Sequence, residues 1–350
     1  MRVVFVLGAS VGGIGTYVRE LAEHCVARGD EVVVLGPQST EDHFAFSAVG
    51  AGFVPISNLR TLRRALAGAG ADVVHSHGFK AAALANLARA GQRRRPRHIV
   101  TLHNAILATG LRAHISAVIE RLAVRPADAV LGASADLVYR ATELGAKHAA
   151  LVPVPAPLLP EPTRTPAEVR AELGVGEEFL LLNVGRLAPQ KSLPLLLDAV
   201  AALDDVALRL VIAGEGPERA GLAARIEAEK LPVTLLGRRS AADIADLLAA
   251  ADAFVLSSRW EARALVVQEA LRAAVPVVAA AVGEIPALVA DAARLVPPDD
   301  AAALAEAIRA VLNDPDLRER LRAAGQAQAA TWPTTAEALD AARAWLAWPE

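Results

Sequence analysis

The chain has 350 residues, which suits two domains of ordinary size better than one. The chain is 54% apolar, but no apolar run approaches the roughly 18 residues that cross a bilayer. Its single cysteine, Cys25, excludes an intrachain disulfide and a cysteine-based metal site, so we expect a cytoplasmic protein. The formal charge of −3 combines a net positive stretch over residues 1–160 with a net negative remainder. Aromatic residues make up only 4% of the chain and do not interleave with the basic residues, and this absence argues against nucleic acid as a partner.

Short apolar strands alternate with Ala- and Leu-rich helical segments along the chain, a pattern typical of a parallel sheet that is covered on both faces. In the first half we expect strands at 2–7, 31–35, 72–75, 98–102 and 129–131. A glycine-rich loop, GGIG, follows the first strand, and glycine lets backbone amides approach a ligand closely. A basic cluster precedes the fourth strand and indicates a solvated helix end, with peripheral contact to the inner face of an anionic membrane as the alternative. This cluster consists of Arg93, Arg94, Arg95 and Arg97.

A proline-rich segment at 151–162, LVPVPAPLLPEP, predicts the linker between two domains, because proline lacks a backbone donor and blocks helix formation. A second series of strands follows and indicates that a Rossmann-like unit is repeated. We therefore expect an N-terminal domain at 1–157, a C-terminal domain at 163–333, and a last helix at 334–350 that begins at a threonine cap. The strands expected in the second domain are 179–184, 208–213, 233–236, 253–256, 275–278 and 294–296.

The segment LLNVGRLAPQKSLP places two cations, Arg186 and Lys191, between a buried strand and a helix that starts near Leu193. An arginine fork and a lysine point charge can together bind two adjacent phosphates, and the amides of a helix N-terminus favour the same anion. Lysine is rare here, with four in the chain, so its presence in this loop is notable. The alternative is an ordinary solvated loop.

The segment FVLSSRWEARALVVQEALR carries two glutamates, Glu261 and Glu269, eight residues apart where a loop enters a helix. A carboxylate accepts paired hydrogen bonds from vicinal hydroxyls, so one glutamate can bind a sugar and the other a nucleoside. A helix cap and a solvated helix face would explain the same spacing. The one Asp-x-Asp, at Asp314 and Asp316, precedes a helical segment that Asn313 or Asp314 can cap, so we expect no metal site there.

Taken together, GRLAPQK, AGEGP and SSRWE with a glutamate eight residues later resemble the family 4 retaining glycosyltransferases. The resemblance extends to the GGIG loop, to HSHG at 75–78, to TLHN around His103 and to the TW before the last helix. It implies an α/β fold of the GT-B class, in which two Rossmann-like, doubly wound parallel-sheet domains face a cleft and the C-terminal helix returns to the N-terminal domain.

The resemblance also implies a role for individual residues. Arg186 and Lys191 would hold the donor diphosphate, Glu261 would lie beside the transferred sugar, Glu269 would bind the ribose, and His103 would approach the sugar hydroxyls or the reacting centre. The other positions carried over are Gly13, Gly15, Gly185, Gly214, Gly216, Arg263, Ala264 and Leu265 on the donor side, and Gly12, His75, His77 and Asn104 on the acceptor side. The implied reaction is a retaining, metal-independent transfer without a cofactor, from a nucleotide diphosphate sugar (UDP favoured over GDP) to a small-molecule or lipid-linked acceptor.

The sequence departs from the family in one prominent place, where Ala262, Arg263 and Ala264 replace the usual Gly-Phe-Gly. Arg263 would either grip an anionic group of the donor or point to solvent. We further expect at most one of His75 and His77 to face the cleft, because they alternate at a strand end. A nucleotide-sugar epimerase and a non-catalytic binding or partner subunit remain as alternatives. An NAD-dependent oxidoreductase fits less well, since GGIG does not match G-x-G-x-x-G.

Overall fold

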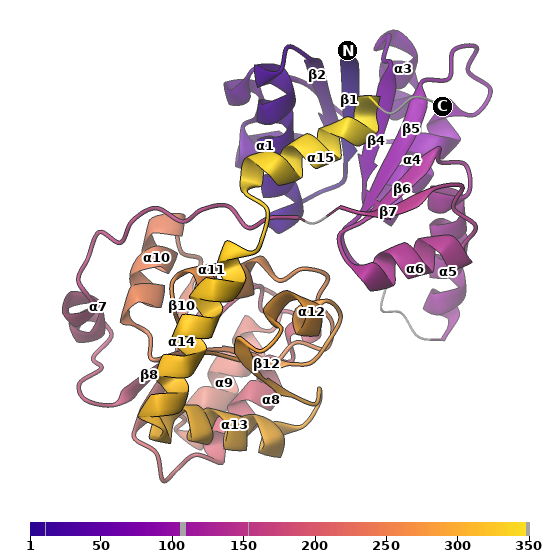
Figure 1. Ribbon diagram of the computed structural model, residues 1–350. Coiled ribbons are helices and arrows are strands. Elements are labelled where there is room, and N and C mark those ends of the chain that lie inside the picture. The colour runs from indigo at the N-terminus through magenta and orange to yellow at the C-terminus, as the bar shows by residue number, and fades with distance from the viewer. Residues whose placement is uncertain (11, 106–109, 153, 348–350) are drawn as a thin grey trace. The chain divides into compact units, whose positions relative to one another are not determined.

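The structure is a computed structural model that describes residues 1–10, 12–105, 110–152 and 154–347 (Figure 1). The chain divides into two compact units. Unit 1 consists of Met1–Val154 and Pro333–Glu350, and unit 2 consists of Pro155–Trp332. Each unit is built on one parallel sheet with helices on both faces.

Unit 1 contains a seven-stranded sheet in the order β3-β2-β1-β4-β5-β6-β7, in which all neighbouring strands are parallel. The predicted strands are present, although β4 continues to His77, two residues beyond its predicted end. The edge strands β3 and β7 were not predicted, because both are short and largely solvent-accessible. The strands are β1 Arg2–Leu7, β2 Glu31–Gly36, β3 Gly52–Pro55, β4 Val73–His77, β5 Arg97–Leu102, β6 Ala129–Gly132 and β7 Ala149–Leu151.

The last helix of the chain, α15, packs against α1 of unit 1 (yellow and indigo in Figure 1). Asp340 of α15 accepts hydrogen bonds from His24 Nε2 and Arg28 Nη2, both at 2.8 Å. Thr334 caps α15 by accepting a hydrogen bond from the Glu337 amide at 3.2 Å, so the predicted threonine cap and the return of this helix to the first domain are confirmed. The helices of unit 1 are α1 Gly13–Ala27, α2 Gln38–Phe44, α3 Leu59–Gly68, α4 Phe79–Arg89, α5 Leu111–Val124, α6 Ala135–Glu143 and α15 Thr335–Ala347.

Unit 2 contains a six-stranded parallel sheet in the order β10-β9-β8-β11-β12-β13. Strand β12 begins two residues later than predicted, after Pro276, which has no N–H to donate to a ladder. Asp314 caps α14 by accepting from the Leu317 amide at 2.9 Å, as predicted. The strands are β8 Phe179–Val184, β9 Leu208–Ala213, β10 Val233–Gly237, β11 Ala253–Leu256, β12 Val277–Ala280 and β13 Ala293–Val296. The helices are α7 Pro166–Glu172, α8 Leu193–Ala201, α9 Arg219–Glu229, α10 Ala241–Ala250, α11 Leu265–Arg272, α12 Ile285–Val289, α13 Ala301–Asn313 and α14 Pro315–Ala330.

Apolar residues on both faces of the unit 2 sheet explain why its strands read as continuous apolar runs. In β8, Leu180 and Leu182 belong to one core cluster and Leu181 belongs to the other, because successive side chains point to opposite faces. This arrangement, repeated in two units, confirms the predicted fold of two Rossmann-like parallel-sheet domains. The strand order reverses between β1 and β4 in unit 1 and between β8 and β11 in unit 2. Ligands of open parallel sheets bind beyond the carboxyl ends of the strands at such switch points.

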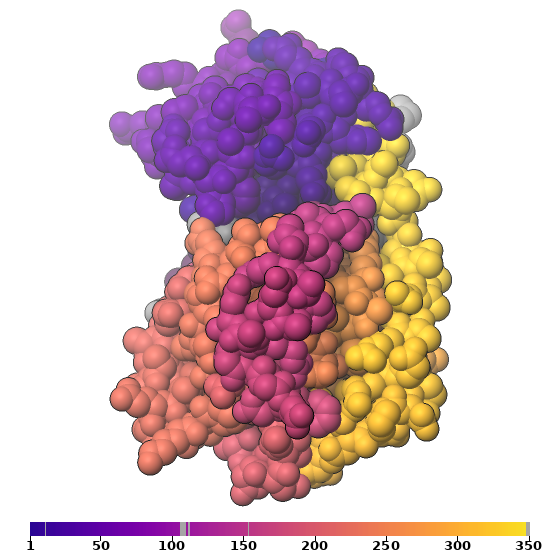
Figure 2. Space-filling view, turned by 90° about the vertical axis from the view of Figure 1, so that its left-hand side faces the viewer, coloured from indigo at the N-terminus to yellow at the C-terminus, as the bar shows by residue number. Residues whose placement is uncertain are grey.

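The proline-rich segment forms neither helix nor strand over residues 154–162. Its part beyond Pro155 runs along unit 2 (Figure 2), and the buried Ala156 amide donates to Gln268 Oε1 of α11 at 3.1 Å. Further on, Thr163 donates from its backbone N–H to Asp246 Oδ1 of α10 at 2.6 Å. The predicted linker residue Pro153 lies outside the described residues.

Candidate functional site

The loop that follows β8 brings Arg186 and Lys191 to the carboxyl edge of the unit 2 sheet, beside the switch point. Arg186 is exposed, and no described residue forms a hydrogen bond or ion pair with its guanidinium. Lys191 ends a short 3-10 turn, and its ammonium Nζ lies 2.5 Å from Glu261 Oε1. The loop therefore presents one unpaired cation and one cation that is held by a carboxylate.

Glu261 reaches this position from the loop that follows β11, the strand next to β8. Its side chain is 9% exposed, and Oε1 also accepts a hydrogen bond from Ser258 Oγ at 2.6 Å. Backbone contacts join the two loops, because Gln190 donates from Nε2 to the Trp260 carbonyl oxygen at 2.6 Å and accepts at its own carbonyl from Arg259. Residues 70 positions apart in the sequence thus form one polar cluster, which we call the Lys191–Glu261 cluster (Lys191, Ser258 and Glu261), and Arg186 lies on the same loop as Lys191.

Three glycines beside this cluster are required for close packing between loops. A Cβ atom on Gly214 would overlap the carbonyl oxygen of Gly185, and one on Gly216 would overlap that of Leu187. Gly283 has a φ of 51°, and a Cβ there would overlap the Glu261 carbonyl oxygen. The donor-side role of Gly185, Gly214 and Gly216 stays a prediction, and the structure adds a packing reason for Gly214 and Gly216, whereas a Cβ on Gly185 would make only ordinary contacts with the Lys191 side chain.

Glu269 lies one turn into α11 and forms no hydrogen bond with Lys191 or Glu261. It lines a cavity of about 250 Å³ together with Arg272 and the segment from Pro157 to Pro162. Burial raises the pKa of Glu269 to about 7, and the nearby Arg272 charge opposes this shift. Ala264 and Leu265 form the start of the same helix, at its N-cap and its first position.

Arg263 is half-buried and packs against an aromatic ring, so of the two alternatives for this residue the solvent-facing one is wrong, and donor binding stays a prediction. Its guanidinium carbon lies 6.0 Å from the ring centroid of Trp332, and that of Arg272 lies 5.7 Å from the same centroid. Burial lowers the pKa of both arginines. Trp332, which follows α14, therefore packs against the arginine that stands within the Ala-Arg-Ala replacement of the usual Gly-Phe-Gly, and no local sequence pattern predicts this contact.

In unit 1, two neighbouring strands form a histidine ladder, which consists of His75 and His77 on β4 with Thr101 and His103 at the end of β5. His75 Nε2 lies 2.7 Å from Thr101 Oγ1, and His77 Nδ1 lies 3.1 Å from His103 Nε2. The rings of His75 and His77 lie on one side of the sheet, with centroids 4.2 Å apart. The expectation that at most one of them faces the site was wrong in its reasoning, because strand residues two apart share a face.

Burial keeps the ladder uncharged. It lowers the pKa of His75 to about 3 and of His103 to about 4, and the pKa of His77 falls well below its usual value for the same reason. His75 has no exposed surface and His103 has 6%. Tyr17 of α1 packs edge-on against the rings of His77 and His103. Neutral imidazoles in this setting can donate or accept one hydrogen bond per nitrogen but do not carry charge at neutral pH.

Near the start of α1 and the end of β5 lie the remaining predicted positions, which are Gly13 and Gly15 on the donor side and Gly12 and Asn104 on the acceptor side. Gly12 is the N-cap of α1 and Gly13 its first residue, both exposed, whereas Gly15 is buried where a Cβ would overlap the ring of Phe44. Asn104, next to His103, is exposed. Gly15 thus has a packing requirement of its own, whereas a Cβ on Gly12 would meet open space.

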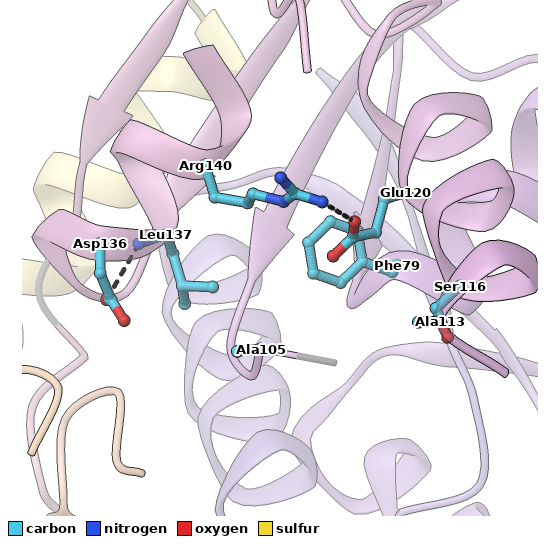
Figure 3. Close-up of a pocket in the computed structure, with 8 residues that line it drawn as sticks. All are labelled: Phe79, Ala105, Ala113, Ser116, Glu120, Asp136, Leu137 and Arg140. Atoms are coloured by element: carbon cyan, nitrogen blue, oxygen red, sulfur yellow. Dashed lines mark hydrogen bonds and ion pairs between the residues drawn. The ribbon is translucent and has the colours of Figure 1, made fainter. Parts of the chain in front are cut away.

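Unit 1 also contains a cavity of about 320 Å³ that the sequence did not predict (Figure 3). On its wall Arg140 Nη2 of α6 pairs with Glu120 Oε2 of α5 at 2.5 Å, and Glu120 is 6% exposed. These two residues lie on different helices, and no local motif marks them. The cavity is lined by Phe79, Ala105, Ala113, Ser116, Glu120, Asp136, Leu137 and Arg140.

The basic cluster before β5 is partly engaged within unit 1. Arg94 pairs with Asp72 at 3.3 Å, and Arg97 donates to the carbonyl oxygen of Leu346 in α15, while Arg93 and Arg95 are exposed. None of the described helices combines the length and apolar character needed to cross a membrane. Within the described ranges, no three His, Cys, Asp or Glu residues are grouped so that they could hold a metal ion.

Family comparisons agree with this arrangement of two units. The family model described as glycosyl transferases group 1 matches residues 166–328, and the glycosyl transferase 4-like domain matches residues 12–157. The chain belongs to the group 1 glycosyltransferases. It is 34% identical to the alpha-D-kanosaminyltransferase of Streptomyces kanamyceticus over 44% of this chain and 42% of that protein. It is 36% identical to the D-inositol 3-phosphate glycosyltransferase of Geodermatophilus obscurus over 77% of this chain and 66% of that protein.

Solved structures support the fold assignment of this group 1 glycosyltransferase. Anabaena HepE in complex with UDP and glucose superposes with a TM-score of 0.86 at 21% identity, covering 99% of each chain. Sucrose-phosphate synthase from Thermosynechococcus elongatus gives a TM-score of 0.80 at 24% identity, covering 99% of this chain and 98% of that one. The chain spans about half the length of the first curated relatives that it matches, 42% and 52%.

Proposed function

We propose that this protein is a retaining glycosyltransferase that moves a sugar from a nucleotide diphosphate donor without a metal ion. The observation that carries the proposal is the Lys191–Glu261 cluster, because it joins a cation to a buried carboxylate beside the switch point of unit 2, with the Arg186 cation on the same loop. A nucleotide diphosphate needs positive charge, and a sugar needs a hydrogen-bond acceptor for its hydroxyls. The cluster offers both groups within hydrogen-bond reach of each other.

The leaving group of such a reaction develops negative charge on its terminal phosphate. Fixed donors such as Arg186 and Lys191 stabilise that charge, and removal of one donor of this kind costs on the order of 10² to 10³ in rate. In our proposal these side chains supply the charge that a divalent metal supplies in other transferases. Substitution on the same face of the sugar, with the departing phosphate taking the acceptor proton, would retain the anomeric configuration.

The donor that we propose is a UDP-sugar, with a GDP-sugar as the alternative. Support for UDP comes from HepE, solved with UDP and glucose, and support for GDP from a Mycobacterium tuberculosis relative named as a GDP-mannose-dependent mannosyltransferase. In the proposed site Glu269 binds the ribose hydroxyls, which either nucleotide presents.

The acceptor that we propose is a small-molecule or lipid-linked alcohol, and the cavity of unit 1 is the candidate for its pocket. Its walls combine the apolar side chains of Phe79 and Leu137 with the Glu120–Arg140 ion pair. Sites for small ligands commonly join an apolar lining with a few fixed polar groups. Relatives named for phosphatidylinositol dimannoside and for inositol 3-phosphate act on different acceptors, so the cavity supports a proposed acceptor pocket and no particular compound.

The test is turnover of a panel of UDP-, GDP-, ADP- and TDP-sugars, followed as nucleotide release in EDTA with and without candidate acceptors. We expect acceptor-dependent release with one donor, and a loss of at least a hundredfold in Lys191→Met. Lys230→Met is the matched control, because Lys230 is an exposed lysine of the same unit outside the cluster. Donor binding without release under any acceptor would favour a non-catalytic subunit, and inversion of a sugar hydroxyl without transfer would favour an epimerase.

A further inference from the structure

The histidine ladder of unit 1 contains buried ring nitrogens without partners, and these restrict where its hydrogens can lie. His77 Nε2 and His75 Nδ1 are sealed from solvent and have no hydrogen-bond partner. A neutral imidazole carries one hydrogen, on either nitrogen. Which nitrogen carries it decides whether the ring donates or accepts at each side.

His98 on the opposite face of β5 shows how such a hydrogen can be assigned. Asn86 donates from Nδ2 to the carbonyl oxygens of Leu122 and Ala123, so its Oδ1 faces His98 Nδ1 at 2.7 Å. The hydrogen of His98 therefore lies on Nδ1, and Nε2 accepts from Ser76 Oγ at 2.8 Å. Both nitrogens of this histidine are satisfied.

His77 has one satisfied nitrogen and one that is not. If its hydrogen were on Nε2, a buried N–H donor would remain unpaired, which is rarer in proteins and less favourable than an unpaired acceptor. The hydrogen of His77 is therefore assigned to Nδ1, which donates to His103 Nε2 at 3.1 Å. His103 must then carry its own hydrogen on Nδ1.

The Nδ1 atom of His103 is the ring nitrogen left to bind a ligand in the hydrogen-bonded pair of His77 and His103. It has no hydrogen-bond partner among the described residues, and it is not among the nitrogens that are sealed from solvent. We propose that His77 is a positioning residue that fixes the tautomer of His103, so that His103 donates a hydrogen bond from Nδ1 to a hydroxyl oxygen of the bound substrate. His103 is then a hydrogen-bond donor and not a general base.

The identity of the ligand as a sugar substrate rests on the proposed function, but the assignment of the His103 tautomer does not. The tautomer is determined from two-bond ¹H–¹⁵N spectra of the histidine rings in the ¹⁵N-labelled protein near neutral pH, with signals assigned by His77 and His103 variants. We expect neutral His77 and His103, each with its hydrogen on Nδ1, and His98 with the same pattern serves as the internal reference. A hydrogen on Nε2 of His103 overturns the proposal whether or not the protein turns over a donor.

Two variants of similar shape test the consequence for catalysis. His77→Asn keeps a donor near the position of Nδ1, whereas His77→Leu removes it. We expect His77→Leu to lose about tenfold in kcat/KM, the effect of about one hydrogen bond, and His77→Asn to recover most of this loss. Thr101→Val is the matched control, because it removes the partner of His75 from the same ladder and leaves the His77–His103 pair intact.

The spectra keep the test decisive if His77→Leu folds poorly, since they use the unaltered protein. Equal kcat/KM in His77→Leu and the unaltered protein would overturn the positioning role. An equal loss in His77→Leu and Thr101→Val would do so as well, because it would indicate a general effect on packing. Absence of turnover with every donor would contradict the proposed function and leave the tautomer assignment to stand or fall on the spectra.

Discussion

Lys191→Met should cause a small loss of thermal stability in unit 2 and a large loss of turnover. Methionine keeps much of the apolar stem of lysine and removes the charge that lies 2.5 Å from Glu261 Oε1. The Glu261 side chain is 9% exposed and, among the described residues, would keep the Ser258 hydroxyl as its side-chain hydrogen-bond partner. Leaving a buried group short of one hydrogen bond costs about 1–3 kcal/mol, and we expect the lower half of this range because the Lys191 side chain is 19% exposed. In a unit of this size each kcal/mol lowers Tm by about 2–4 °C.

A double variant distinguishes the two effects. Lys191→Met combined with Glu261→Gln replaces the ion pair by two neutral side chains, so Tm should recover towards that of the unaltered protein, while nucleotide release stays about 10² to 10³ below it. Thermal unfolding and nucleotide release are measured on the same samples. Turnover within threefold of normal in the single variant, or recovery of turnover together with Tm in the double variant, would refute the reasoning.

Three other predictions concern unit 2. Gly283→Ala should lower the free energy of unfolding by more than about 2 kcal/mol in chemical denaturation, because the new Cβ overlaps a carbonyl oxygen at a φ of 51°. The control is Gly221→Ala, in an open helical position, which should raise the free energy of unfolding by up to about 1 kcal/mol. Burial raises the folded-state pKa of Glu269 to about 7, above its unfolded value, so ionisation of this carboxyl should make unit 2 less stable as pH rises from about 4.5 to 7. Glu269→Gln should remove this pH dependence of the free energy of unfolding, measured by denaturation at a series of pH values. If Glu269 binds the ribose, the variant should also remove a rise in nucleotide affinity over the same pH range. Arg263→Ala should cost about 1 kcal/mol of stability through loss of its contact with Trp332 and change the donor KM less than threefold; a tenfold rise in KM would instead indicate that Arg263 binds the donor.

Buried central strands were the part of the fold that the sequence predicted best. The bounds of Phe179–Val184 and Leu208–Ala213 agree with the structure, because apolar side chains are needed on both faces of a covered parallel sheet. The edge strands at 52–55 and 149–151 were missed, since an edge is only half covered and needs no apolar run. The strand at 277–280 begins later than its apolar run predicts, because Pro276 within that run has no N–H to donate to a strand ladder.

In the candidate site, likewise, residues that are close in the sequence could be predicted, whereas contacts between distant segments could not. Arg186 and Lys191 stand out because loop, cations and helix start are contiguous in the sequence. Their contact with Glu261 depends on the pairing of β8 with β11, which no local pattern reports.

The packing of Arg263 on Trp332 likewise joins the start of α11 to the end of α14. The pairing of Glu120 with Arg140 joins α5 to α6. Each contact depends on which helices become neighbours in the folded chain. The residue types alone do not specify that, so these contacts could not be predicted before the fold was known.

Calorimetric titration in EDTA tests most directly whether Arg186 and Lys191 bind the diphosphate of a nucleotide donor. UDP is compared with UMP, and GDP with GMP, in the unaltered protein and in Lys191→Met. We expect one diphosphate to bind at least about tenfold more tightly than its monophosphate, which corresponds to about 1.4 kcal/mol, and we expect the difference largely to disappear in the variant. Equal affinity of diphosphate and monophosphate in the unaltered protein would contradict this binding role.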